Sequence, residues 1–441
     1  MNVSNYPAVQ PISGTVDIGT IPEVEIKNDV GNPIPVSGVL DAIIQGSPTV
    51  TFQPTSLDAF GRLRISNPVT LFDSSLRYHE RHDFDTATAN GGTLTYDFNA
   101  SVRRLTVTNQ SGSQVIRESL RVFPYQPGKS LLILNSFVMA PAISGLQQRI
   151  GYFTTNNGVY FDQTNTTKSF VIRSYGGAVT EESIPQSQWN GDKLDGTGPS
   201  GLTLNLNASQ IFWIDIEWLG VGTVRCGFII NGQYIVCHSF HHANLSQYST
   251  TYMGTATLPV RCEITNLTAT TASSSMFQQI CSTVISEGGY TPYDITETAG
   301  TGINEKGLST ANIYYPIASI RLAPGRLNSI VIPRQIDILS PTVNYYRWVL
   351  LYNATLTGAT WTGLSSTGTV QYDTGATAVS GGTELQSGFV SSRQSQDLGS
   401  DMFQYQLGRY LNGTSEMVTL ALASTSNNAQ ILAQLGWQEL T

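Results

Sequence analysis

Charged residues are scarce in this chain, at 12% of its 441 positions, where about 25% is usual. Lysine is especially rare, with copies only at positions 27, 129, 168, 193 and 306. Strong helix formers are therefore few, while Tyr, Phe, Val, Ile and Thr are plentiful. This composition excludes a mainly helical protein and predicts an all-β fold.

Other absences exclude several classes of protein. The net charge is −8 and no basic run occurs, which argues against nucleic acid as a partner. No apolar run approaches the roughly 18 residues of a membrane-spanning segment, so we expect no membrane contact. The first residues lack a basic region followed by an apolar stretch, so we expect no secretory signal. Four cysteines in a chain this long make no disulfide framework.

Residues 1–55 differ from the rest of the chain. The stretch Pro11–Val16 is echoed by Pro35–Leu40, and both are short extended segments bounded by Pro and Gly. Segments of this kind bury too little apolar surface to fold alone, so they need strands of the chain's own body or of an adjacent subunit. We expect residues 1–55 to be an extended anchoring arm, with a flexible linker as the alternative.

Strand-like segments with short polar breaks recur through the remainder of the chain. Those in residues 56–272 predict one large antiparallel β-sandwich, and those in residues 273–441 predict a second, smaller one. The stretch Met276–Ile285 fits either a helical face or a strand, and we take it as a boundary element.

The segment Ile211–Trp218 predicts a strand whose two faces differ in chemistry. Phe212, Ile214 and Ile216 alternate with Trp213, Asp215 and Glu217. The first set is expected to face a core. The second would place an indole and two carboxylates on a concave, solvent-exposed face.

A hairpin is predicted next, with Asn231-Gly232 as a two-residue type I′ turn. Counting back from this turn places Phe228 opposite Ile235 and Cys226 opposite Cys237. A disulfide at that position would be strained, so the favoured interpretation is two small buried hydrophobic residues.

The run Trp213–Gly220 resembles the active-site strand of concanavalin-like β-glucanases of the laminarinase and lichenase kind. In those enzymes a Glu-x-Asp-x-Glu run supplies the nucleophile and the general acid/base. Asp215 and Glu217 match the second and third carboxylates, but Trp213 stands at the position of the nucleophile. A retaining glycosidase needs two carboxylates across the bond it cleaves. The resemblance therefore implies a concanavalin-like jelly roll, with glycan binding at Trp213, Asp215 and Glu217 as one use of the groove, and no catalytic residue.

The histidines occur in two groups, His79 with His82 and His238 with His241 and His242. These residue types can bind zinc or nickel, but His79 and His82 would point to opposite faces of a strand. We expect hydrogen-bonded histidines, no metal site and no cofactor. The sequence also lacks a nucleophile elbow and a phosphate-binding loop.

Taken in order, several segments resemble a family of bacteriophage virion proteins found in phages of aquatic bacteria. They are Pro35–Gly38, Asp58–Pro68, Leu71–Asp73, Tyr125–Ser130, Trp189–Gly198 and Phe212–Gly220. Members of that family are structural, minor tail, fibre or decoration proteins.

The resemblance implies a non-enzymatic part of the virion exterior, assembled in the bacterial cytoplasm. Its partners would be copies of itself, as a trimer or another homo-oligomer, and other virion proteins. The alternative function is a lectin-like module that binds a host surface glycan around Trp213, Asp215 and Glu217.

Overall fold

The fold is described by a computed structural model. It covers residues 57–59, 63, 67–79, 83–290, 295–341, 344–365, 368–391, 393–398 and 405–440. The predicted arm, residues 1–55, lies outside these ranges. The regular secondary structure of the described residues is almost entirely β-strand, and every strand pair among them is antiparallel, so the predicted fold class is confirmed.

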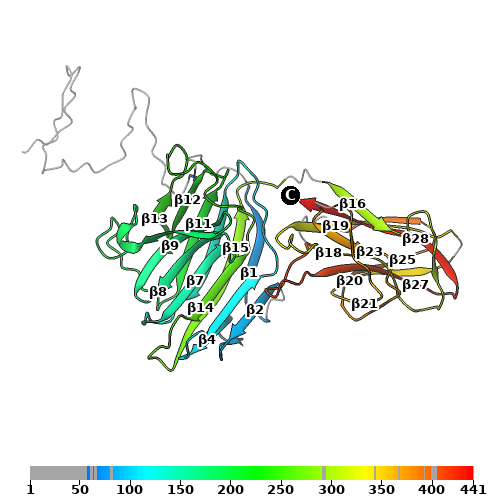
Figure 1. Ribbon diagram of the computed structural model, residues 1–441, viewed down its shortest axis with the longest axis horizontal. Coiled ribbons are helices and arrows are strands. Elements are labelled where there is room, and N and C mark those ends of the chain that lie inside the picture. The colour runs from blue at the N-terminus through cyan, green and yellow to red at the C-terminus, as the bar shows by residue number, and fades with distance from the viewer. Residues whose placement is uncertain are drawn as a thin grey trace, which may run out of the picture. The chain divides into compact units, whose positions relative to one another are not determined.

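The larger body is built on two sheets (Figure 1). In the eight-stranded sheet the order is β13-β12-β11-β6-β15-β4-β3, and β1 pairs with β15. Its strands are β1 (Val69–Ser75), β3 (Thr93–Asp97), β4 (Val102–Thr108), β6 (Leu131–Val138), β11 (Gln210–Glu217), β12 (Thr223–Ile230), β13 (Gln233–Phe240) and β15 (Ser274–Ser286).

The seven-stranded sheet has the order β10-β9-β8-β7-β14-β5-β2. Its strands are β2 (Phe84–Ala89), β5 (Gln114–Ser119), β7 (Leu146–Phe153), β8 (Gly158–Thr164), β9 (Thr167–Tyr175), β10 (Val179–Pro185) and β14 (Val260–Asn266). A single turn of 3-10 helix, Gln186–Gln188, follows β10. Within the described ranges no helix has the length and apolar character needed to cross a membrane.

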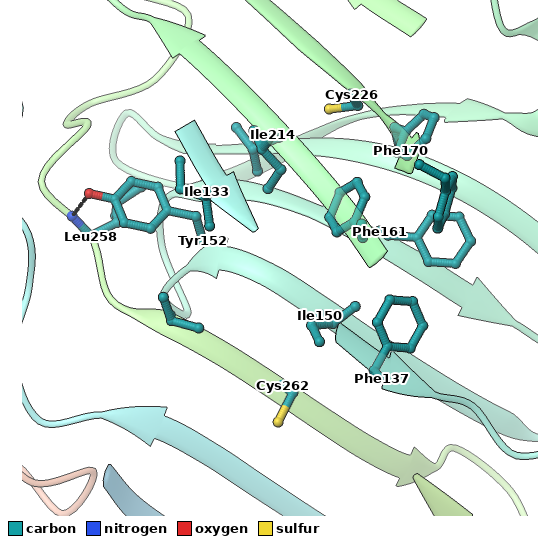
Figure 2. Close-up of a cluster of buried hydrophobic side chains, with 14 of the residues drawn as sticks. Ile133, Phe137, Ile150, Tyr152, Phe161, Phe170, Ile214, Cys226, Leu258 and Cys262 are labelled. Atoms are coloured by element: carbon teal, nitrogen blue, oxygen red, sulfur yellow. Dashed lines mark hydrogen bonds between the residues drawn. The ribbon is translucent and has the colours of Figure 1, made fainter. Parts of the chain in front are cut away.

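The core of the larger sandwich lies between these two sheets. Figure 2 shows Ile133 and Ile214 of the eight-stranded sheet close to Ile150 and Phe161 of the seven-stranded sheet. All four side chains are completely buried. Tyr152 places a polar group in this core, and its hydroxyl accepts a hydrogen bond of 3.1 Å from the backbone N–H of Leu258 (Figure 2). Burial of the Tyr152 hydroxyl without this hydrogen bond would cost free energy. The bond therefore holds the loop before β14 against the core.

A second sandwich follows in the chain and has its own core. One sheet has the order β16-β28-β19-β26 with β17 on β28, the other has the order β22-β23-β18-β27-β20-β25, and β21 pairs with β24. The strands are β16 (Thr296–Gly300), β17 (Lys306–Leu308), β18 (Tyr315–Leu322), β19 (Ile330–Leu339), β20 (Tyr346–Tyr352), β21 (Thr355–Thr357), β22 (Thr362–Gly363), β23 (Val370–Asp373), β24 (Ala378–Ser380), β25 (Thr383–Val390), β26 (Arg393–Asp397), β27 (Met417–Ser424) and β28 (Ala429–Leu440). Trp348 and Trp437 are the largest side chains buried there.

The boundary between the two sandwiches differs from the one expected at residues 272 and 273. The ambiguous stretch Met276–Ile285 lies in strand β15, which pairs with β4, β6 and β1 of the larger sandwich. Phe277 and Val284 belong to the larger core. The apolar residues at helical spacing are explained by a register shift between Gln279 and Cys281, which interrupts the two-residue alternation.

The two sandwiches contact each other through backbone and side-chain hydrogen bonds. The side-chain amide of Gln406 donates to the carbonyl oxygen of Val122 at 2.8 Å, and the backbone N–H of Leu411 donates to Asp85 at 2.7 Å. Ile330 and Ile332 pack with Val122 in a small apolar cluster of their own. The junction is therefore a packed interface and not only a linker.

Candidate functional site

Strand β11 has the two faces that its sequence predicts. Phe212, Ile214 and Ile216 are completely buried in the core between the sheets, as expected. The strand lies between β6 and β12, so both of its edges are hydrogen-bonded. This pairing holds the opposite side chains, Trp213 and its neighbours, on the outer face of the eight-stranded sheet.

That outer face is not exposed where the sequence predicted exposure. Asp215 and Glu217 are 0% exposed and Trp213 is 2% exposed, whereas Ile211 at the start of the strand is 40% exposed. The expectation of two solvated carboxylates is therefore wrong. Arg225 of the adjacent strand β12 contacts both Asp215 and Leu57, and a single-strand pattern contains neither contact.

Asp215 is held by Arg225, which stands directly opposite it on β12. The Nη2 and Nε atoms of Arg225 lie 2.5 and 3.1 Å from Oδ2 of Asp215. The same Nη2 also donates to the carbonyl oxygen of Leu57 at 2.6 Å. Arg225 thus joins the carboxylate to the first described residues of the chain, and Asp215 serves as the anion of a buried ion pair.

The indole of Trp213 is packed among neighbours. It pairs with Leu134 on one side and Gly227 on the other, and its ring meets Tyr234 edge-on at 5.6 Å. A Cβ atom at Gly227 would lie 2.9 Å from Nε1 of Trp213, so the glycine provides the space that the ring occupies. With 2% of its surface exposed, this indole offers no free face for stacking on a sugar.

The side chains of this site are therefore buried and out of reach of a substrate. The position of the glucanase nucleophile holds Trp213, and both remaining carboxylates are excluded from solvent. A glycosidase needs one carboxyl group as an acid and another as a nucleophile, both in reach of the substrate. Trp213, Asp215 and Glu217 alternate with the core residues of β11, and all three are buried.

The predicted hairpin is present, with one change of register. Asn231 and Gly232 both have positive φ angles, 53° and 75°, as a type I′ turn requires, and Phe228 stands opposite Ile235. Beyond that pair, the register shifts between Cys226 and Gly227, so Cys226 is opposite His238.

The predicted pairing of Cys226 with Cys237 is wrong because this bulge adds one residue to β13. Both thiols are free and buried in the larger core, as the favoured interpretation held. Burial raises the pKa of each thiol, which keeps both protonated and unreactive at neutral pH.

Two of the described histidines, His238 and His242, are hydrogen-bonded parts of the fold. Nδ1 of His238 accepts the backbone N–H of Asn190 at 3.2 Å, and burial lowers the pKa of His238 to about 4. Nδ1 of His242 donates to the carbonyl oxygen of Gly222 at 2.7 Å. His79 is exposed, and His82 lies outside the described residues. In the part of the chain that the structure describes, no three His, Cys, Asp or Glu side chains are placed to hold a metal ion.

The outer face of the seven-stranded sheet carries a set of charged residues that the sequence pattern did not predict. We call them the charged rows. Their members alternate in sign from strand to strand: Glu118 (β5), Arg261 and Glu263 (β14), Arg149 (β7), Asp162 (β8), Arg173 (β9) and Glu181 (β10). Five of the seven are at most 8% exposed: Glu118, Asp162, Arg173, Arg261 and Glu263.

Direct cross-strand pairing explains how the charged rows form. Glu263 stands opposite Arg149, and Nη1 of Arg149 lies 3.1 Å from Oε1 of Glu263. Arg261 stands opposite Glu118, with Nη1 at 2.8 Å from Oε2. Burial by itself raises the pKa of Glu263, but the charges of Arg261 and Arg149 outweigh it and hold the pKa below its ordinary value. The alternation Arg261-x-Glu263 within a predicted strand is the signal that points to this arrangement.

Comparisons with known proteins show no family for this chain. No protein-family model matches the chain, and no curated protein matches it in sequence. Among solved structures, it is similar to a protein of unknown function from Shewanella oneidensis MR-1 (TM-score 0.34, 10% identity, 56% of this chain and 99% of that one). It is also similar to the CBM2 module of the evolved Dit of Lactobacillus casei BL23 phage J-1 (TM-score 0.33, 8% identity, 51% of this chain and 98% of that one).

The Bacillus licheniformis β-glucanase is a third such structure (TM-score 0.31, 12% identity, 48% of this chain and 96% of the enzyme). Each similarity extends over about half of this chain. At such identities nothing follows about ligand or activity.

Proposed function

We propose that this chain is a non-enzymatic structural component of a bacteriophage particle. It would lie on the virion exterior, at the tail, neck, fibre or capsid surface, and contact copies of itself and other virion proteins. The ordered sequence motifs that resemble phage virion proteins support this assignment, and so does the lysine-poor all-β fold.

The burial of the two carboxylates on β11 is the main support for the proposal that the protein is not an enzyme. Asp215 and Glu217 are 0% exposed, and Asp215 forms an ion pair with Arg225. A substrate would first have to displace the contact between Arg225 and Leu57. A catalytic carboxyl group must reach its substrate to transfer a proton, and these two carboxylates are excluded from solvent. We therefore assign them a structural role.

The anchoring role falls to residues 1–55. Among the described residues, both hydrophobic cores are formed by residues between Phe72 and Trp437. The alternating apolar residues of the arm would instead gain their burial from neighbouring subunits, by adding strands to them. Contacts made only in the assembled particle then stabilise each copy by mass action.

Deletion of residues 1–55 tests this proposal. We expect the remaining chain, which keeps every core residue that the structure describes, to fold with an unchanged thermal midpoint and to be absent from purified particles. Circular dichroism measures folding, and quantitative mass spectrometry of particles measures incorporation against the full-length chain expressed in the same host. Incorporation of the shortened chain at the full-length level would refute the anchor.

A lectin-like role at Trp213, Asp215 and Glu217 remains the alternative, and the structure gives it less support. The three side chains are at most 2% exposed. A hollow of about 260 Å³ does open beside them on the same sheet face, lined by Leu134, Ile211 and others. None of the three residues is among those that line it, so the hollow does not make their side chains accessible to a sugar.

A further inference from the structure

A second cavity, of about 510 Å³, lies at the junction of the two sandwiches and is lined by both. Glu118 and Arg261 contribute from the larger sandwich, together with the turn between β7 and β8. The β18–β19 loop, which includes Arg326, and a loop that includes Arg409 contribute from the smaller one. Its volume is in the range of small-molecule sites, which often lie between domains.

The inner wall of this cavity is fixed by ion pairs at the end of the charged rows. Oε1 of Glu118 lies 2.6 Å from Nη2 of Arg409, and Oε2 lies 2.8 Å from Nη1 of Arg261. Nε of Arg409 also donates to Oδ1 of Asn328 at 2.8 Å. Glu118 is 2% exposed and Arg261 is 4% exposed. The wall is therefore preorganised, and both carboxylate oxygens are already occupied.

The charge left over in the cavity is positive. Glu118 and Glu263 balance Arg409 and Arg261, which leaves the guanidinium of Arg326. Among the described residues Arg326 has no side-chain hydrogen bond or ion pair, and it is exposed at the cavity. A planar guanidinium binds a carboxylate through two parallel hydrogen bonds. An anionic ligand is thus favoured locally, although the chain as a whole carries −8.

The remaining lining has the groups that bind sugar hydroxyls. Thr155 and Asn156 are exposed on the β7–β8 turn, and Ser329 ends the β18–β19 loop. Tyr410 adds a half-buried aromatic ring. Hydroxyl and amide side chains around an aromatic ring match a pyranose, which offers hydroxyls at its rim and C–H groups on its face.

We infer that this junction cavity binds an acidic saccharide, with the sugar carboxylate on Arg326 and the ring hydroxyls on the polar lining. The site is separate from Trp213, Asp215 and Glu217. The inference does not rest on incorporation into a particle, because the cavity is formed by one chain.

Calorimetric titration of the purified full-length chain tests the inference. The probes are three sugar acids, galacturonate, glucuronate and N-acetylneuraminate, with galactose, glucose and acetate as comparisons. We expect at least one sugar acid to bind, and the matching neutral sugar or acetate to bind at least tenfold more weakly. Arg326→Gln is expected to lower the affinity for the sugar acid by about 10- to 100-fold, since the substitution removes the charge-assisted pair between the guanidinium and the sugar carboxylate.

Arg77→Gln is the matched control, because Arg77 is also exposed but lies outside the cavity. It is expected to leave binding unchanged. Four results would overturn the inference: no sugar acid binding at about 10 mM, neutral sugars binding as tightly as acidic ones, acetate binding as tightly as the sugar acids, or Arg326→Gln without effect. None of these results depends on whether the chain is a virion component.

Discussion

Glu263→Gln is expected to lower the free energy of unfolding of the larger sandwich by about 3–5 kcal/mol, the usual effect of breaking a buried ion pair. Oε2 of Glu263 accepts from Nε and Nη2 of Arg261 at 3.0 and 2.7 Å, and Oε1 is paired with Arg149. The amide would leave two arginines on the sheet face without the anion between them. Urea unfolding followed by tryptophan fluorescence measures the change.

Glu384→Gln provides the control for this prediction. Glu384 is also paired with an arginine, Arg347, at 2.9 Å, but both side chains are about 40% exposed, at 43% and 38%. Exposed pairs contribute at most about 1 kcal/mol, so the control should change stability little. Equal effects of the two substitutions would show that the charged rows are no more than surface ion pairs.

Asp215→Asn is the second substitution with a large expected effect, about 3 kcal/mol or more of lost stability. The Asp215 side chain is completely buried, and the Arg225 side chain is 11% exposed, so the arginine would lose its counter-charge in a poorly solvated position. This outcome separates a structural carboxylate from a functional one. Removal of a catalytic or ligand-binding carboxylate commonly leaves stability unchanged or raises it.

Asp97→Asn is the matched control for Asp215→Asn. Asp97 pairs with Arg104 at 2.6 Å, with side chains 23% and 38% exposed, so its loss should cost about 1 kcal/mol or less. Thermal unfolding of both variants beside the wild type gives the comparison. A higher midpoint for Asp215→Asn would mean that the carboxylate is maintained for function and that the sheet face is a working site.

Local patterns in the sequence predicted much of the fold. Alternation in Ile211–Trp218 identified the core face of β11, because side chains on a strand point alternately to its two sides. Asn231-Gly232 located the hairpin turn, because few other pairs adopt two positive φ angles. Both features depend only on neighbours in the sequence.

The features that the sequence did not predict depend on distant segments or on single-residue changes of register. The cover over Asp215 includes Leu57, 168 residues away from Arg225 along the chain. One bulge in β13 moved Cys237 away from Cys226, and counting back from the turn did not use its signal, Gly227, although an isolated glycine within a strand often marks a bulge. The ion pair of Arg261 with Glu118 spans 143 residues and requires β14 to lie beside β5.

A cryo-electron-microscopy map of the phage particle, with this chain located in it, would show whether the chain is an exterior structural protein. We expect both sandwiches to lie on the exterior and residues 1–55 to be bound to neighbouring subunits. Absence of the chain from the particle would contradict the proposed function, and so would an arm folded entirely onto its own copy.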